Sequence, residues 1–197
     1  MSSSSLIYIP PNWVERLSWA DVFARSAPIE VDIGCGKGAF LLWASQQHPK
    51  RNFFGVDRLL TRLRKVESKL KRNGLANARL FRLEASYFVQ YLVPANSVAT
   101  YHIYCPDPWP KRRHQSRRLV NETFVMALQT SLMPHGCVRF STDDTDYFQS
   151  ANETFRRSKS FQECEQAAPV KEALTDFEQQ FLQEGKPIHR CCWQKQD

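Results

Sequence analysis

Short apolar runs alternate along this chain with longer segments in which apolar residues recur every three or four positions. Short runs rich in β-branched and aromatic side chains predict strands, and the longer spacing predicts helices that bury one face. Residues 59–72 show the helical pattern clearly, because four apolar side chains follow spacings of four, three and four before a glycine ends the segment.

From residue 28 onward the predicted strands and helices follow one another in turn. The seven predicted strands span residues 28–33, 52–57, 78–85, 97–105, 137–141, 161–165 and 188–193. The predicted helices span residues 39–48, 59–72, 119–133, 146–157 and 175–184. Alternation of this kind favours βαβ units, and the ending favours an antiparallel hairpin at one sheet edge. We therefore expect an α/β fold with a mostly parallel seven-stranded sheet, helices on both faces and an antiparallel edge hairpin.

The first residues do not follow this pattern. Residues 6–27 read as irregular, with two prolines and an amphipathic stretch. We expect a short N-terminal segment at 1–27 and one domain at 28–197, since no linker divides the rest.

Composition narrows the classes of protein that fit. The chain has 197 residues, of which 42% are hydrophobic, enough for one well-packed core. Its formal net charge of +7 suits an anionic partner such as nucleic acid. The six cysteines show neither a CxxC pair nor a spacing typical of metal ligands, so we predict no metal site. No apolar run is long enough for a membrane span and no signal peptide is recognisable, so we expect a cytoplasmic protein that does not contact membranes.

A glycine-rich loop at residues 32–38 follows the first predicted strand. Asp32 precedes glycines at 34, 36 and 38, which allow a sharp turn and a close approach of a ligand to the backbone. A dinucleotide site has the spacing GxGxxG, whereas the third glycine here comes one residue earlier. The DxGxGxG form resembles motif I of class I S-adenosylmethionine-dependent methyltransferases. A phosphate-binding or purely structural turn is the alternative.

Two more acids follow predicted strands. Asp57 ends the second strand, where a carboxylate can accept hydrogen bonds from ribose hydroxyls, and Glu84-Ala85 ends the third, near where such enzymes hold the adenine. Ligands of open α/β sheets bind beyond the carboxyl ends of the strands, so these residues are candidates for cofactor contact.

The segment PDPWPK at residues 106–111 is the rarest feature of the sequence. Prolines on both sides of Asp107 restrict the backbone and hold the carboxylate in one direction, which favours a site that positions a planar base. A structural proline-rich turn is the alternative.

A basic run follows this loop. Its members are Lys111, Arg112, Arg113, His114, Arg117 and Arg118. Such runs are often solvated surface, but the position beside the acidic loop favours contacts to phosphates. A second basic stripe, on the predicted helix 59–72, favours the same partner.

From about residue 17 to the C-terminus the chain resembles the bacterial tRNA (guanine-N7)-methyltransferase family. The matching pieces are residues 17–23, 32–38, 54–57, 73–77, 106–111, 117–119, 142–143 and 175–178. The resemblance implies a Rossmann-like class I methyltransferase that uses S-adenosylmethionine to methylate N7 of a guanosine in the variable loop of tRNA. The sequence leaves open whether the protein is a monomer or a homodimer. The family usually has Glu at positions 32 and 57, Asp at position 84 and Phe at position 105, and these departures keep the charges.

The resemblance and the motifs together assign residues to roles. Those predicted to contact the cofactor are Asp32, Gly34, Gly36, Asp57, Glu84, Ala85 and Asp107. Those predicted to contact the tRNA are Lys111, Arg112, Arg113, His114, Arg117, Asp143, Thr175, Phe177 and Glu178. Asp107 is the predicted catalytic acid. Rival hypotheses are a class I methyltransferase acting on a small molecule or protein, a tRNA-binding module without catalysis and, more distantly, a nicotinamide oxidoreductase.

Overall fold

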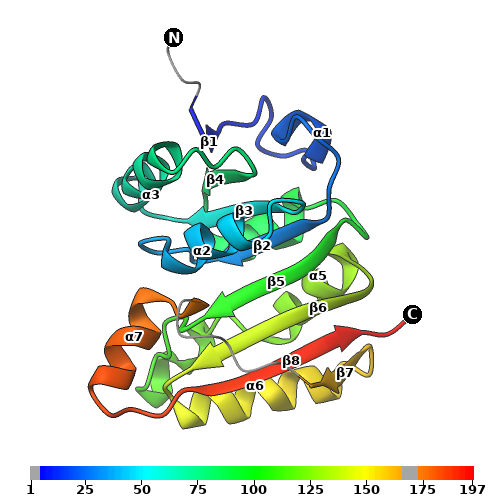
Figure 1. Ribbon diagram of the computed structural model, residues 1–197. Helices are drawn as coiled ribbons and strands as arrows, with labels where there is room; N and C mark the ends of the chain where they lie inside the picture. Colours follow the sequence, from blue (N-terminus) through cyan, green and yellow to red (C-terminus); the bar gives the residue numbers. More distant parts are fainter. Residues whose placement is uncertain (1–4, 166–172) are drawn as a thin grey trace.

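An eight-stranded mixed sheet forms the centre of the molecule. The computed structural model describes residues 5–165 and 173–197. The strands are β1 (Ile7–Tyr8), β2 (Ile29–Ile33), β3 (Asn52–Asp57), β4 (Ala78–Arg82), β5 (Val98–Tyr104), β6 (Leu132–Thr142), β7 (Phe161–Cys164) and β8 (His189–Lys195). Their order in the sheet is β1-β4-β3-β2-β5-β6-β8-β7 (Figure 1). The strands from β1 to β6 pair in parallel, and β8 runs antiparallel to both β6 and β7.

Helices cover both faces of this sheet. The α-helices are α1 (Trp19–Val22), α2 (Ala39–Gln47), α3 (Leu60–Arg72), α4 (Ala85–Tyr87), α5 (Glu122–Ser131), α6 (Thr145–Arg157) and α7 (Asp176–Gln183). A π-helix, η1 (Phe88–Leu92), and a 3-10 helix, η2 (Arg112–Arg117), complete the set.

The apolar core divides into two clusters, one on each face of the sheet. Helices α2 and α3 pack on one face through Leu41 and Val66, among others. Helices α1, α5 and α6 pack on the opposite face, where Phe124 and Phe155 are fully buried. Strand residues alternate between the clusters: Phe53 belongs to the first and Phe54 to the second. The predicted α/β fold, with its parallel strands and antiparallel edge hairpin, is confirmed.

The predicted number of strands was wrong, because the sheet has eight and not seven. The extra strand comes from the segment that reads as irregular. Ile7 and Tyr8 pair with Leu80 and Phe81 of β4, so the segment before residue 28 extends the sheet at one edge. Two residues are too few to show a strand pattern, and the pairing partner lies far along the chain.

Three local elements also differ from the sequence-based expectation. Residues 85–92 form α4 and η1, where no helix was predicted. Residues 112–117 of the basic run form the 3-10 helix η2. Strand β6 starts at Leu132, directly after α5, and includes His135 with a φ of 61° where the sequence reads as a turn.

Within residues 5–165 and 173–197, no helix combines the length and the apolar character that a bilayer crossing requires.

Candidate active site

The carboxyl ends of six parallel strands meet at one edge of the sheet. The order reverses at β2, whose neighbours are β3 on one side and β5 on the other. Ligands of open α/β sheets bind at such a switch point. Helix α7 lies beyond the tips of β5 and β6 at the same edge (Figure 1). This edge therefore carries the candidate site.

The glycine loop between β2 and α2 is held by its own backbone and by Asp57. Gly34 and Cys35 donate N–H bonds to the Val56 carbonyl, and Gly36 donates to Asp57 Oδ2 at 3.2 Å. Gly36 has a φ of 55°, and Gly38 a φ of 79° in a position where an added Cβ would lie 2.7 Å from a methyl of Val66. Position 38 thus needs glycine both for its positive φ and for close packing against α3.

A pocket opens above this loop. Its lining comes from the glycine loop, the end of β5 and the start of α7: Asp32, Gly34, Cys35, Gly36, Lys37, Ala39, Phe40, Arg62, Tyr104, Thr175, Asp176, Phe177 and Gln180. Of the predicted cofactor residues, Asp32, Gly34 and Gly36 line the pocket, and of the predicted substrate residues Thr175 and Phe177 do. Two sequence motifs more than 130 residues apart therefore form one cavity.

Asp32 is a strongly perturbed acid of this pocket. Its residue is 3% exposed, and its Oδ2 atom has no hydrogen-bond partner among the described residues. Burial, together with the negative charges of Asp57 and Glu178, raises the pKa of Asp32 to about 8. An unpartnered buried carboxyl oxygen favours a ligand that brings a donor or a positive charge.

Asp57 and Glu84, also predicted to contact the cofactor, hold nearby backbone. Asp57 Oδ1 accepts from the Leu59 N–H at 2.8 Å, and Arg62 lies 3.7 Å from Oδ2. Both carboxylate oxygens of Glu84 cap α4, accepting N–H bonds from Ser86 and Tyr87. Neither residue lines the pocket described here, so their cofactor contacts, like that of Ala85, stay predictions.

A hydrogen-bonded chain that the sequence did not reveal orients Tyr104 at the pocket. Glu30 pairs with Arg51 and accepts from His102 Nε2 at 2.7 Å, and His102 Nδ1 lies 2.9 Å from the Tyr104 hydroxyl. Burial raises the pKa of Glu30, but the hydrogen bonds and charges of His102 and Arg51 outweigh it and lower the pKa to about 2. Burial lowers the pKa of His102 more than Glu30 raises it, so the ring is neutral at pH 7.

The hydrogen bonds of this network can run in only one direction when His102 is neutral. A carboxylate can only accept, so the proton of neutral His102 lies on Nε2 and Nδ1 accepts from the Tyr104 O–H. The Tyr104 oxygen therefore offers lone pairs to the pocket that it lines. Glu30, His102 and Tyr104 all lie inside strands, where an apolar environment was the expectation and no spacing signals a network.

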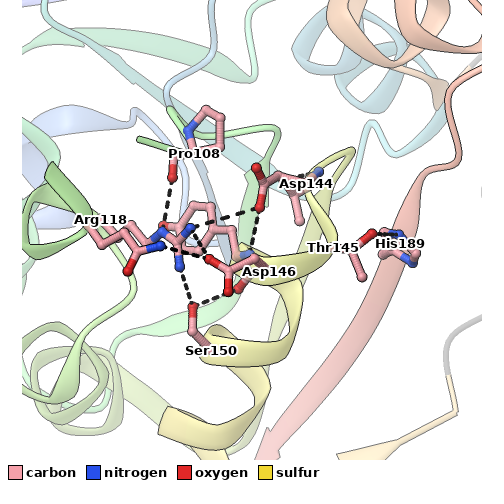
Figure 2. A network of polar contacts seen from close by, with 10 residues as sticks. Pro108, Arg118, Asp144, Thr145, Asp146, Ser150 and His189 are labelled. Carbon is pink, nitrogen blue, oxygen red and sulfur yellow. Dashed lines mark hydrogen bonds and ion pairs between the residues drawn. The ribbon is translucent and has the colours of Figure 1, made fainter. Parts of the chain in front are cut away.

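The PDPWP loop leaves β5 beside this pocket, and a buried arginine fixes it. Arg118 Nε donates to the Pro108 carbonyl at 2.9 Å, and its other nitrogens bond Ser150 Oγ at 3.0 Å and Asp146 Oδ2 at 2.6 Å (Figure 2). Asp144 lies 3.8 Å away, and the guanidinium stacks 4.9 Å above the Tyr147 ring. The assignment of Arg118 to a phosphate-binding surface was wrong, because the residue is 7% exposed and already fully paired.

We expect Arg118→Ala to lower the free energy of unfolding by roughly 2–4 kcal/mol, because it leaves the Pro108 carbonyl and Asp146 without their shared donor. The matched variant is Arg117→Ala, since Arg117 is exposed and only stacks over Trp109 at 5.0 Å. Its expected loss is below about 1 kcal/mol. Urea unfolding of both variants measures the difference, and equal losses would contradict a structural role for Arg118.

The remaining basic run is exposed. Lys111, Arg112 and Arg113 form no ion pair with any residue in the described part of the chain, and half-buried His114 lies edge-on to Trp109. Asp107 is exposed as well and has no hydrogen bond or ion pair with a described residue. These side chains are free to meet a ligand, as their predicted roles require.

The segment 175–178 is held in place by hydrogen bonds of its own Glu178. Glu178 is 2% exposed, its Oε1 accepts from Ser141 and Arg190, and Oε2 accepts from the Thr175 N–H in a capping box at the start of α7. These bonds place Thr175 and Phe177 at the pocket. Asp143, beyond the end of β6, lies 4.0 Å from Lys186. Substrate contact by Glu178 and Asp143 stays a prediction.

The chain is similar to known methyltransferases in sequence. The family described as "Putative methyltransferase" matches residues 26–191. The tRNA (guanine-N(7)-)-methyltransferase of Syntrophotalea carbinolica is 35% identical over 178 residues, which cover 87% of this chain and 75% of that protein. That of Geobacter metallireducens is 37% identical over 145 residues, covering 74% and 69%. That of Thermotoga maritima is 35% identical over 91% of this chain, and the match spans 54% of that longer protein, about half its length.

Solved structures show the same fold. The 16S rRNA methyltransferase KamB superposes with a TM-score of 0.70 at 13% identity, covering 91% of this chain and 93% of that one. A 30S ribosomal methyltransferase from an uncultured bacterium gives a TM-score of 0.65 at 15% identity, covering 90% and 92%. At such identities the likeness is one of fold alone.

Proposed function

Because the chain belongs to the tRNA (guanine-N(7)-)-methyltransferase family, we propose that it transfers a methyl group from S-adenosylmethionine to N7 of a guanosine in tRNA in the cytoplasm. The observation that carries the proposal is the joining of the glycine loop and the α7 capping box in one pocket, beside a rigid acidic loop with exposed cations. The variable loop of tRNA is the proposed target, and the product is N7-methylguanosine.

The residues of the pocket fit S-adenosylmethionine. The unpartnered Oδ2 of Asp32 suits a cationic group such as the ammonium of the cofactor's amino-acid part. The loop backbone is open for close approach, since an added Cβ at Gly34 would meet nothing within 4 Å. The Tyr104 oxygen adds an acceptor. A pyrophosphate fits less well, because its negative charge would favour the protonated form of Asp32 still further and would gain no ionic partner from this buried carboxyl.

The proposed mechanism asks this chain to position the base and not to deprotonate it. Guanine N7 carries an in-plane lone pair and is unprotonated at neutral pH, so no general base is needed. When bound, S-adenosylmethionine would supply a sulfonium methyl group that N7 attacks in line, so that the carbon–sulfur bond breaks, S-adenosylhomocysteine leaves and the base becomes cationic. Asp107 accepts hydrogen bonds from N1–H and the exocyclic amine of guanine, and its charge favours the cationic product. The target nucleotide leaves its stack to reach this edge of the sheet.

The proposed tRNA surface is the exposed basic run beside Asp107. Lys111, Arg112, Arg113 and Arg117 offer four charges to phosphates without first breaking an ion pair to a described residue. His114 lies next to them, edge-on to Trp109.

The test is transfer of labelled methyl from S-adenosylmethionine to unmodified tRNA, followed by digestion and identification of the nucleosides. N7-methylguanosine is the expected product. Methyl transfer to another base would discard the guanine assignment and keep the cofactor. Cofactor binding with no transfer to tRNA would favour a small-molecule or protein substrate, and tRNA binding without cofactor binding would favour a non-catalytic module.

A further inference from the structure

Three of the six cysteines lie together at the far side of the sheet, away from the pocket. Cys137 lies on β6, Cys192 on β8 and Cys164 on β7. Their sulfur atoms all lie within 4.8 Å of one another, and Cys164 Sγ approaches Cys192 Sγ to 2.6 Å. Cys164 and Cys192 are direct cross-strand partners, and Cys192 is opposite Arg139, two residues after Cys137. The three side chains therefore share one face of the sheet.

This face is opposite to the one that carries the larger apolar cluster. The neighbours Cys191 and Trp193 point the other way, into the larger apolar cluster. Cys192 is 4% exposed, whereas Cys137 and Cys164 are half-buried. Solvent therefore reaches the cluster from the side of Cys137 and Cys164. Arg139 lies on the same face, opposite Cys192 and two residues after Cys137. A metal site needs convergent ligands and an entry path for the ion, and this cluster offers both.

We propose that Cys137, Cys164 and Cys192 form a binding site for a thiophilic metal ion of the Zn²⁺ type, an inference that goes beyond the proposed function. Zinc–thiolate bonds are about 2.3 Å long, so three sulfurs around one ion lie roughly 3.8 Å apart, within the spread of this cluster. The Cys164–Cys192 contact has to lengthen, which rotation about the Cα–Cβ bonds allows. Each thiol that becomes a ligand releases its proton to solvent.

The ion has three protein ligands and one position for water. No other histidine, cysteine or carboxylate of the described residues belongs to the cluster. Thiolate ligands select zinc and other soft ions over magnesium or calcium. Bound here, the ion ties the edge strand β7, which pairs only with β8 among the described strands, to β8 and β6. Its expected effect is to stabilise this edge of the sheet.

The experiment uses the full chain, freshly reduced and freed of metal by a chelator. Zn²⁺ binding is measured by competition with a chromogenic chelator, and Cd²⁺ is added in parallel to observe the ultraviolet thiolate-to-metal charge-transfer band. We expect one equivalent of either ion to bind and the Tm to rise. Cys137→Ser, Cys164→Ser and Cys192→Ser are each expected to lower the affinity by more than about 100-fold, because loss of an outer-shell partner alone costs roughly 10–100-fold.

The matched control is Cys191→Ala, which removes the adjacent thiol on the opposite face and is expected to keep full metal binding. Circular dichroism of the three serine variants separates loss of a ligand from loss of the fold. The proposal is overturned if the reduced wild-type chain binds no zinc, or if binding survives all three serine substitutions. It is equally overturned if the cluster proves to be a Cys164–Cys192 disulfide that no mild reductant opens. None of these outcomes bears on methyl transfer.

Discussion

Replacing Asp107 by alanine is expected to lower kcat/KM for tRNA methylation by about 10³-fold or more while leaving the Tm unchanged. A site that accepts hydrogen bonds from a substrate N–H rejects an analogue without that N–H by roughly 10⁴–10⁵-fold. Removal of the acceptor from the enzyme is therefore expected to have a large effect. The loss belongs mainly in kcat, because the base is still delivered with the tRNA but is no longer held in line with the methyl group. Single-turnover rates at saturating tRNA and cofactor measure it.

Two comparisons make this result specific. Asp107→Asn keeps the shape and one acceptor but loses the charge, so we expect a smaller loss than for alanine. Asp21→Ala removes an exposed acid of α1, outside the candidate site, and is expected to leave the rate unchanged. Because Asp107 is exposed and bonds to no described residue, each variant should unfold within about 0.5 kcal/mol of wild type. Near-normal turnover of the alanine variant would remove Asp107 from the mechanism.

The general architecture was predictable because its signals are local. Each of the seven predicted strands has a counterpart in the sheet, six of them at nearly the same residues, whereas β6 begins five residues before the predicted strand. The acids that follow the parallel strands meet at one edge because parallel strands end together. The glycine loop was predictable for the same reason, since a turn that needs positive φ marks itself by glycine in the sequence.

What the sequence did not reveal depends on partners far along the chain. Arg117 and Arg118 are adjacent and chemically identical, yet the first is exposed and the second is buried, because only Arg118 meets α6 and Tyr147. The three-cysteine cluster arises because β8 inserts between β6 and β7, an order that no spacing encodes. The hydrogen bond between Glu30 and His102 links β2 and β5 and joins residues that are 72 positions apart.

Asp32 is expected to make protein stability and cofactor affinity depend on pH in opposite directions. Its pKa rises from an ordinary value of 3.8 to about 8 in the folded, cofactor-free protein. Between these values the unfolded chain has released the proton and the folded chain still holds it. The free energy of unfolding therefore falls as the pH rises from about 4 to about 8, and this contribution becomes constant above pH 8. Each unit of pKa elevation corresponds to about 1.4 kcal/mol, so a loss of at least about 2 kcal/mol is expected.

Cofactor affinity should change the other way. If the ligand's cationic group pairs with the ionised Asp32, the Kd for S-adenosylmethionine falls as the pH approaches 8, by up to about tenfold per pH unit. Glu30 does not interfere, because its pKa of about 2 confines its effect on stability to acidic solution, where protonation removes the stabilisation. The buried carboxylate of Asp32 therefore lowers the stability of the cofactor-free protein, and a bound cationic ligand would supply the partner that its Oδ2 atom lacks among the described residues.

The Asp32→Asn variant tests both the predicted pH dependence of stability and that of cofactor affinity. The variant cannot ionise, so we expect it to be more stable than wild type at pH 7.5, with a flatter decline of stability between pH 5 and pH 8. It should bind S-adenosylmethionine at least about 100-fold more weakly, without the rise in affinity toward pH 8, because a charged hydrogen bond to the buried oxygen is lost. Urea unfolding and calorimetric titration, each at several pH values, give the two curves. Subtracting the variant's curves from those of wild type removes the contribution of every other titrating group. Parallel curves for the two proteins would mean that Asp32 is not the group that links stability to cofactor binding.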